Sequence, residues 1–289
     1  MSLLRSLLYD LKEARCNPVT LTHQTLYAAT QTYLKVLDRL LLFNVPWFKN
    51  HMVETYHGKV VRVQEAEKII RVDRKIELRN LEQVLPYKHA RDLVLRNPQN
   101  VLAYECACRA QKKDPCRPTD VCLVVGEPLA DLLRVLQPLR TRRISADEAV
   151  QIIKDEDDRG HMHSAWFKTA TLDRFYAICN CCKCCCLGMK FFLQYKMKAL
   201  VPSGFVSVIG PDCKGCGNCA RNCQFGAIEM QAAVEDGQER RRAVRDWDRC
   251  YGCGVCESKC KSGNITVVPD ARKGVPLDID ALERTRLTQ

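Results

Sequence analysis

Eight cysteines near the C-terminal end of the chain follow one strict spacing twice. The spacing is C-x2-C-x2-C-x3-C, and the two runs consist of Cys213, Cys216, Cys219 and Cys223, and then Cys250, Cys253, Cys256 and Cys260. Three thiolates spaced in this way can close on one iron–sulfur cube, while the fourth points toward a second cube. Two zinc ribbons are the alternative, but a ribbon uses separated C-x2-C pairs rather than four cysteines in one run. The pattern therefore predicts two iron–sulfur clusters.

Glycines lie between these cysteines, where they let the backbone turn tightly and bring N–H groups close to cluster sulfurs. They are Gly215, Gly217, Gly252 and Gly254. With them, residues 206–269 resemble a bacterial-type two-cluster ferredoxin, in which each run gives three ligands to one 4Fe-4S cluster and its last cysteine to the other. The resemblance implies a module with pseudo-twofold symmetry. It also implies that Cys213, Cys216, Cys219 and Cys260 bind one cluster, and that Cys250, Cys253, Cys256 and Cys223 bind the second.

The two runs depart from the ferredoxin pattern at the residue after each fourth cysteine. The family has proline there, whereas this chain has Gln224 and Lys261. The change removes a fixed φ and restores a backbone N–H. Because neither change removes a ligand, we expect both clusters to assemble. An added amide donor or ammonium group near sulfur would raise a reduction potential.

Ten further cysteines form two groups upstream, and only Cys16 stands alone. The groups are Cys106, Cys108, Cys116 and Cys122, and then Cys179, Cys181, Cys182, Cys184, Cys185 and Cys186. Six thiols within eight residues exceed what packing as small apolar side chains requires. All ten are therefore candidate metal ligands, and we expect one or more additional iron–sulfur clusters. Which of them bind is open, because four from one group, two from each, or three with a histidine would all satisfy a four-ligand cluster.

Zinc is the alternative metal for these upstream cysteines, especially for Cys106, Cys108, Cys116 and Cys122. His161 and His163 are also candidate ligands, because alternate residues of a strand face the same side. The simpler explanation for the two histidines is that they pack and form hydrogen bonds near the site.

The middle of the chain also resembles a known kind of domain. It contains C-x-C-R, P-C, V-C-L, G-H-x-H and I-C-N-C-C-x-C-C-C, at residues 106–109, 115–116, 121–123, 160–163 and 178–186. These motifs resemble the cysteine-rich domain that precedes ferredoxin modules in certain anaerobic iron–sulfur proteins. The resemblance implies a redox function, but it implies no substrate.

The elements around the upstream cysteines indicate an α+β fold. The apolar run 101–104 predicts a short buried strand that ends at the first cysteine group. A helix is expected before Pro138, and a second helix between Ser145 and Gly160, where Ser145 and Glu148 form a capping box. Strand, helix, helix and strand in this order, with ligands at the ends of elements, predict a mixed α+β domain.

The chain is expected to contain three parts. Residues 1–57 form an amphipathic helical segment, residues 58–200 a cysteine-rich α+β domain with an additional metal cluster, and residues 201–289 the ferredoxin module with a tail. Leucines at steps of three and four in 26–41 predict a helix, which packs on a core or partner. Residues 40–48 would also suit peripheral contact with a membrane. Charged residues exclude a transmembrane helix.

We expect the protein to be cytoplasmic. Peripheral contact with the inner face of the membrane is compatible with this location. Residues 1–15 read as an amphipathic helix rather than a signal peptide. Adjacent cysteines suit metals in a reducing compartment better than a disulfide framework. Oxygen-sensitive clusters would favour an anaerobic cell.

Lysine and arginine number 45 against 34 aspartates and glutamates, which gives a net charge of +11. Basic residues such as Arg109, Lys112 and Lys190 stand close to the cysteine groups. Because thiolate-bound clusters are anionic, these cations would offset that charge or steer a partner. We expect a redox partner with an acidic docking face, such as a flavoprotein or an oxidoreductase subunit. Arg240, Arg241 and Arg242 are balanced by acidic neighbours, so we expect a solvated insertion there.

The sequence as a whole predicts an iron–sulfur electron-transfer protein, more readily a subunit of an oxidoreductase than a stand-alone enzyme. A reductase with its own active site in the cysteine-rich domain is the alternative, although no catalytic residue stands out. Rossmann, P-loop and haem-attachment motifs are missing. A basic nucleic-acid-binding protein with iron–sulfur or zinc sites is a weaker alternative. The sequence lacks a helix-turn-helix, a C2H2 finger and an aromatic-basic stacking stripe.

Overall fold

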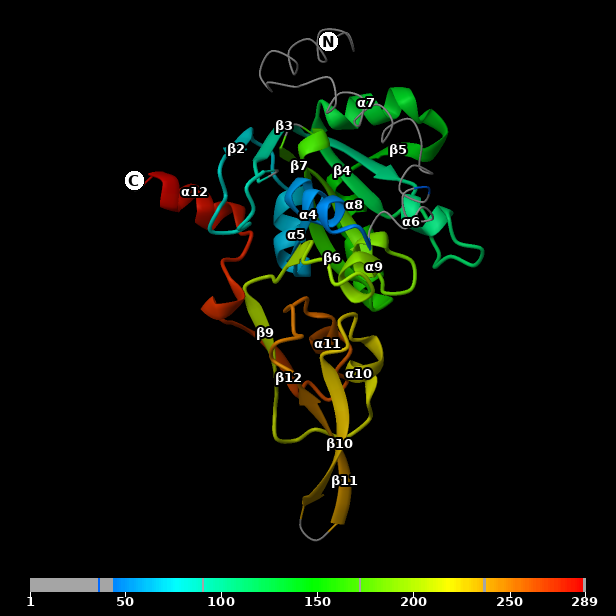
Figure 1. Cartoon of the computed structure of the whole chain (residues 1–289), viewed down its shortest axis with the longest axis vertical. Helices are drawn as coiled ribbons and strands as arrows, with labels where there is room; N and C mark the ends of the chain where they lie inside the picture. The colour runs from blue at the N-terminus through cyan, green and yellow to red at the C-terminus, as the bar shows by residue number, and fades with distance from the viewer. Residues whose placement is uncertain (1–35, 37–43, 90, 172, 236–237, 288–289) are drawn as a thin grey trace.

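The computed structural model describes residues 36, 44–89, 91–171, 173–235 and 238–287 (Figure 1). The helices expected within residues 1–41, and Cys16, lie outside the described residues apart from Val36, which is helical. None of the described helices has both the length and the apolar character needed to cross a membrane. The chain combines helices and strands, as the predicted α+β class requires.

One mixed sheet of eight strands forms the larger part of the molecule. Its order is β2-β3-β4-β7-β6-β1-β8, and β5 also pairs with β3. Every pairing is antiparallel except that of β1 with β8. The strands are β1 (Tyr56–Val61), β2 (Ile76–Leu78), β3 (Leu93–Tyr104), β4 (Cys122–Glu127), β5 (Thr141–Ile144), β6 (Met162–Lys168), β7 (Arg174–Cys181) and β8 (Leu200–Val201).

Two helices pack on one face of this sheet, α5 (Val63–Ile70) and α8 (Ala146–Asp158). Their apolar side chains form a core with alternate residues of the strands, including Leu95 and Ile178. Helix α8 begins as predicted, because the Ser145 hydroxyl accepts a hydrogen bond from the Glu148 N–H at 3.1 Å. This face contains no cysteine in its buried cluster. The metal-binding candidates therefore belong to the other face.

The opposite face carries α7 (Leu129–Leu136) and α9 (Leu187–Leu193), and the short α6 (Ala107–Ala110) follows β3. Its core contains Trp166 and several cysteines. Helix α4 (Pro46–Thr55) packs next to α9 through Met52. The predicted strand at 101–104 is the end of the longer β3, which pairs with β4 on both sides of a register shift between Arg96 and Val101.

The ferredoxin-like part lies below the large sheet in Figure 1. Strand β9 (Phe205–Ile209) pairs antiparallel with β12 (Ile265–Pro269). Two short helices, α10 (Asn218–Asn222) and α11 (Val255–Ser258), follow Gly217 and Gly254, whose φ angles are 73° and 89°. A positive φ at these positions favours glycine. Each helix places cysteines of one run against the short sheet.

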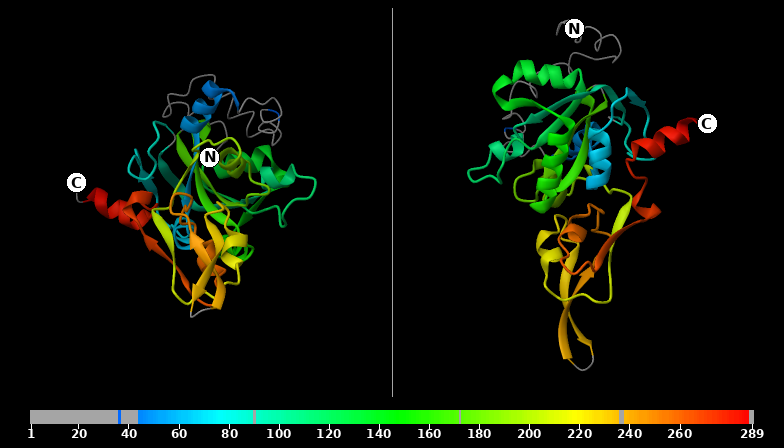
Figure 2. Two further views of the ribbon diagram at one scale, coloured as in Figure 1. Left: turned by 60° about the horizontal axis from the view of Figure 1, so that its bottom comes forward. Right: turned by 180° about the vertical axis from the view of Figure 1, so that it is seen from behind.

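The segment between the two cysteine runs is a hairpin of β10 (Ile228–Glu235) and β11 (Gln238–Arg245). Figures 1 and 2 show that it projects away from the rest of the molecule. The arginine-rich stretch of the sequence belongs to β11, where Arg241 lies opposite Ala232. The segment that was expected to be a solvated insertion therefore contains two paired strands.

The C-terminal tail returns to the large sheet after the short 3-10 turn Ala271–Lys273. Leu277 and Ile279 are buried in the core beneath α5, and helix α12 (Ile279–Leu287) contacts α5. Lys68 of α5 forms an ion pair of 2.6 Å with Asp278. The tail thus ties the ferredoxin-like part back to the cysteine-rich part. The remaining short 3-10 turns are Pro138–Arg140 and Thr169–Thr171.

Candidate metal centres

The eight cysteines of the two runs gather in two sets of four. Cys213, Cys216, Cys219 and Cys260, here called the exposed quartet, line one cavity. Cys223, Cys250, Cys253 and Cys256, here called the buried quartet, line a second cavity. These are the two sets that the ferredoxin resemblance implies. Four thiols around one cavity suit a four-ligand cluster.

The two quartets differ in their exposure to solvent. In the exposed quartet Cys216 is exposed and Cys213 and Cys260 are half-buried, whereas every member of the buried quartet is buried. Burial raises the pKa of Cys256 to about 12. Metals bind thiolates rather than thiols. Binding of a metal cluster by this quartet must therefore remove protons that the buried thiols would otherwise keep.

The sulfurs of both quartets receive hydrogen bonds from the chain. The Ala227 N–H donates to Cys223 Sγ at 3.2 Å. Ser207 Oγ lies 3.6 Å from Cys250 Sγ, and Ser262 Oγ lies 3.5 Å from Cys260 Sγ. Such contacts orient metal ligands and stabilise negative charge on sulfur.

Six upstream cysteines form a closed ring of thiol–thiol contacts on the face of the sheet opposite α5 and α8. In order around the ring they are Cys106, Cys122, Cys179, Cys181, Cys186 and Cys108. Cys181 Sγ and Cys186 Sγ are 3.2 Å apart. The six cysteines of this six-thiol ring come from five places in the chain. Cys106 lies between β3 and α6, Cys108 lies in α6, Cys122 begins β4, Cys179 and Cys181 lie in β7, and Cys186 directly precedes α9.

The remaining four upstream cysteines form a separate compact set. The Sγ atoms of Cys116, Cys182, Cys184 and Cys185 all lie within 4.8 Å of one another. This four-thiol set joins the loop after α6 to the loop between β7 and α9. The two sequence groups therefore do not correspond to the two spatial sets. In particular, Cys116 lies with the later cysteines, so the first sequence group does not make one four-thiol site.

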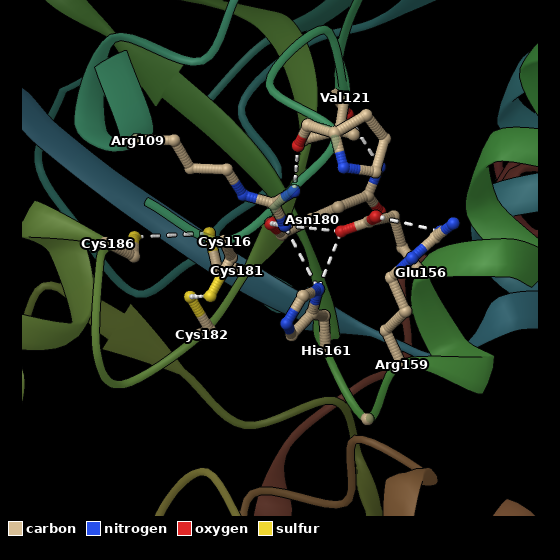
Figure 3. A network of polar contacts seen from close by, with 12 residues as sticks. Arg109, Cys116, Val121, Glu156, Arg159, His161, Asn180, Cys181, Cys182 and Cys186 are labelled. Atoms are coloured by element: carbon tan, nitrogen blue, oxygen red, sulfur yellow. Dashed lines mark hydrogen bonds and ion pairs between the residues drawn. The ribbon is translucent and has the colours of Figure 1, made fainter. Parts of the chain in front are cut away.

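A buried arginine connects the surroundings of both thiol sets. Arg109 is 1% exposed, and it donates to the Pro118 carbonyl at 2.5 Å and to the Asn180 carbonyl at 3.2 Å. Its guanidinium also donates to the Glu156 carboxylate and lies 3.0 Å from His161 Nδ1. Figure 3 shows this network beside Cys116, Cys181, Cys182 and Cys186.

The charge of Arg109 is positioned to act on thiolates. Burial opposes its charge, but the Glu156 carboxylate and then Cys106 and Cys182 raise the pKa of the guanidinium. Cys106 belongs to the six-thiol ring and Cys182 to the four-thiol set. Arg109 can therefore stabilise negative charge in both sets at once.

The two candidate histidines form hydrogen bonds with side chains of other elements. His161 Nδ1 lies 2.6 Å from Glu156 Oε2, and His163 Nδ1 lies 2.6 Å from Asn180 Oδ1. The group of candidate ligands that makes up the four-thiol set includes neither histidine. The packing and hydrogen-bonding explanation of these residues agrees with these contacts.

Lys168 is a buried residue that the sequence analysis did not single out. Its Nζ lies 4.4 Å from the ring centres of both Tyr56 and Tyr176. Burial strongly lowers the pKa of this lysine, while Cys179 and other ring thiols act in the opposite direction. The sequence signal for this residue is a lysine at the end of the apolar run Ala-Trp-Phe.

Gln224 connects the buried quartet to the cysteine-rich part. Its Oε1 accepts a hydrogen bond from the Lys183 N–H at 2.8 Å, and its Nε2 donates to the Gly160 carbonyl at 2.6 Å. Lys183 lies between two members of the four-thiol set, and Gln224 directly follows Cys223. Gln224, one of the two residues that depart from the ferredoxin pattern, therefore makes a contact between the two parts.

The variant Gln224→Leu is expected to lower the free energy of unfolding by about 1–3 kcal/mol, because three backbone groups, the Lys183 N–H and the Gly160 and Asn222 carbonyls, would lose their partner. Anaerobic guanidinium denaturation of the metal-loaded protein measures this change. Gln151→Leu is the matched control, since Gln151 is exposed and bonds only to Asp155 four residues away. Equal destabilisation by the two variants would contradict a structural role for Gln224.

Comparison with known protein families gives a match within the chain. A search of curated proteins finds no match. Residues 212–264 match the family model described as the 4Fe-4S dicluster domain. This segment contains both cysteine runs. Together with the upstream cysteine set, the match identifies the chain as an iron–sulfur protein with a 4Fe-4S domain in its C-terminal part.

Proposed function

We propose that this protein transfers electrons through a 4Fe-4S cluster in each ferredoxin quartet and a further iron–sulfur cluster in the six-thiol ring. The exposed quartet would use Cys213, Cys216, Cys219 and Cys260, and the buried quartet Cys223, Cys250, Cys253 and Cys256. When bound, such clusters accept and release single electrons. The chain's own residues would fix the order of the centres and exclude water between them.

The observation that carries this proposal is one continuous buried cluster of side chains. It includes Cys181 and Cys186 of the six-thiol ring together with all four members of the buried quartet. Trp166 and Met189 lie in the same cluster. Since the cluster is apolar, it keeps water away from the region between the ring and the quartet. This arrangement supports a short and dry route between the two parts of the protein.

Aromatic rings fill the junction between α9 and the buried quartet. Phe192 of α9 lies 5.7 Å from Phe225 and 4.9 Å from Tyr251, measured between ring centres. Phe225 and Tyr251 stack at 4.5 Å. These two residues come two positions after Cys223 and directly after Cys250. Their packing fixes the ligand-bearing backbone against the cysteine-rich part.

The exposed quartet is the proposed contact point for the redox partner. Cys216 is exposed, and Lys214, which lines the same cavity, is exposed as well. Lys261 directly follows Cys260 and is exposed. Two lysines beside an accessible site favour a partner with acidic residues around its own redox centre. A flavoprotein or an oxidoreductase subunit with such a face would fit.

Iron and sulfide analysis of the anaerobically purified protein tests the proposal. We expect about 12 sulfides per chain, because three 4Fe-4S clusters contain four sulfides each. Cys181→Ser should remove the sulfide of the six-thiol ring alone, and Cys253→Ser should remove that of the buried quartet alone. EPR of the reduced protein assigns each loss to a centre. About 8 sulfides in the unaltered chain, unchanged by Cys181→Ser, would exclude a cluster in the ring.

A further inference from the structure

In the four-thiol set each sulfur lies close to all three others, whereas in the six-thiol ring each sulfur contacts its two neighbours around the ring, as Cys181 contacts Cys186. Cys116 Sγ lies 3.3 Å from Cys184 Sγ and 3.8 Å from Cys182 Sγ, and Cys182 and Cys184 are 3.1 Å apart. With Cys185, all four sulfurs lie within 4.8 Å of one another. Among the described residues, this is the one set of potential metal ligands that is so compact.

These separations are those of ligands around one ion. A zinc–thiolate bond of about 2.3 Å places the four sulfurs of a tetrahedral site about 3.8 Å from one another. In a cube, by contrast, each thiolate binds a different iron, so the sulfurs must stand further apart. The ferredoxin quartets show a wider arrangement, because neither is a group of described ligand atoms that all lie within 4.8 Å of one another.

The surroundings of the set also suit a small anionic centre. Four thiolates around a divalent ion carry a net charge of −2. Arg109 acts electrostatically on Cys182, and its guanidinium holds the Pro118 carbonyl in the loop that carries Cys116. Cys182 and Cys185 are buried, Cys116 is half-buried and Cys184 is exposed. An ion could therefore enter from solvent on the Cys184 side.

We propose that Cys116, Cys182, Cys184 and Cys185 bind a single divalent ion, zinc or iron, in tetrahedral thiolate coordination. The site is separate from the six-thiol ring and does not depend on the ring carrying electrons. The ion fixes the 182–185 loop, and with it the Lys183 N–H that donates to Gln224. The ion therefore crosslinks the loop after α6 to the 182–185 loop, which contacts the ferredoxin-like part.

Metal analysis of the unaltered chain is the first test, because it needs no variant to fold. The anaerobically purified protein should contain about one metal ion per chain that has no matching sulfide. X-ray absorption at the zinc edge should show four sulfurs at about 2.3 Å. If the ion is iron, Mössbauer spectra should show one mononuclear tetrahedral iron beside the cluster irons. The absence of both signals would overturn the proposal.

The variant Cys116→Ser/Cys184→Ser is the second test. It should lose about one zinc or iron per chain and keep all of its sulfide, whereas loss of the same number of irons and sulfides would show a cluster instead. Unchanged metal content would equally overturn the proposal. Cys16→Ser is the control for removing a thiol outside the four cysteine sets. Cys181→Ser tests the proposed cluster of the six-thiol ring through the loss of sulfide. The test of the single ion in the four-thiol set depends on metal without sulfide, so the two proposals can fail independently.

Discussion

Arg109→Met is expected to lower the free energy of unfolding by about 3 kcal/mol or more. Arg109 and Glu156 are 1% and 0% exposed, and removing one partner of a buried ion pair leaves the other charge buried. The cost lies toward the lower end of the range for such pairs, because Arg159 still contacts Glu156 at 3.1 Å. Anaerobic guanidinium denaturation of the metal-loaded protein measures the change.

Two further variants make this result specific. Arg142→Met removes an exposed arginine that pairs with Glu148, and it should cost less than about 1 kcal/mol. Arg109→Lys keeps the charge but loses the planar guanidinium that reaches two carbonyls and a carboxylate. It should therefore lower the free energy of unfolding by less than Arg109→Met and by more than Arg142→Met. If Arg109→Met unfolded at the same denaturant concentration as the unaltered protein, the network in Figure 3 would not stabilise the fold.

Lys59→Met is expected to change stability in the opposite direction and to raise it at pH 7 by about 3–5 kcal/mol. Lys59 is fully buried in β1, and its Nζ has no hydrogen-bond partner among the described residues. Burial lowers the pKa of this lysine from 10.5 to about 7. Methionine has a similar length and carries no charge that must leave water.

The pH dependence distinguishes this explanation from simple repacking. Between about pH 7 and pH 10.5 the unfolded chain holds a proton on Lys59 that the folded chain does not. The unaltered protein should therefore gain stability from this residue as the pH rises through that window, and the penalty should be complete below pH 7. Denaturation curves at several pH values should show that Lys59→Met removes this slope.

Lys154→Met is the matched control for Lys59→Met. Lys154 is 52% exposed and forms an ion pair of 3.5 Å with Glu67. Its replacement should change stability by less than about 1 kcal/mol and leave the pH dependence as it was. A destabilised Lys59→Met protein would show that the lysine has a favourable partner in the folded state.

The local patterns of the chain were sufficient for several elements of the fold. The apolar run at 101–104 is the end of β3, and the helix predicted between Ser145 and Gly160 is α8 with its Ser145 cap. These signals depend on neighbours within a few residues, so sequence spacing contains them. The predicted strand covered only the end of β3, because the pairing of residues 93–95 with β2 is a contact that the local pattern at 101–104 does not contain.

The role of Gln224 could not be read from the sequence. Its place after Cys223 suggested an effect on a reduction potential, but its side chain contacts Lys183 and Gly160 of the cysteine-rich part. The partners are 41 and 64 residues away along the chain. No local periodicity encodes such a pairing.

The sequence predicted the eight ferredoxin cysteines from the twin C-x2-C-x2-C-x3-C runs. The resemblance to two-cluster ferredoxins implied their grouping, because in that family the last cysteine of each run belongs with the first three of the other run. The sequence also marked the ten upstream cysteines as candidate metal ligands. Only the tertiary structure divided those ten into a ring of six and a set of four. Cys116 joins Cys182 across 66 residues, because the sheet brings the ends of β3 and β7 to the same region. Spacing along the chain cannot specify a contact that depends on strand order.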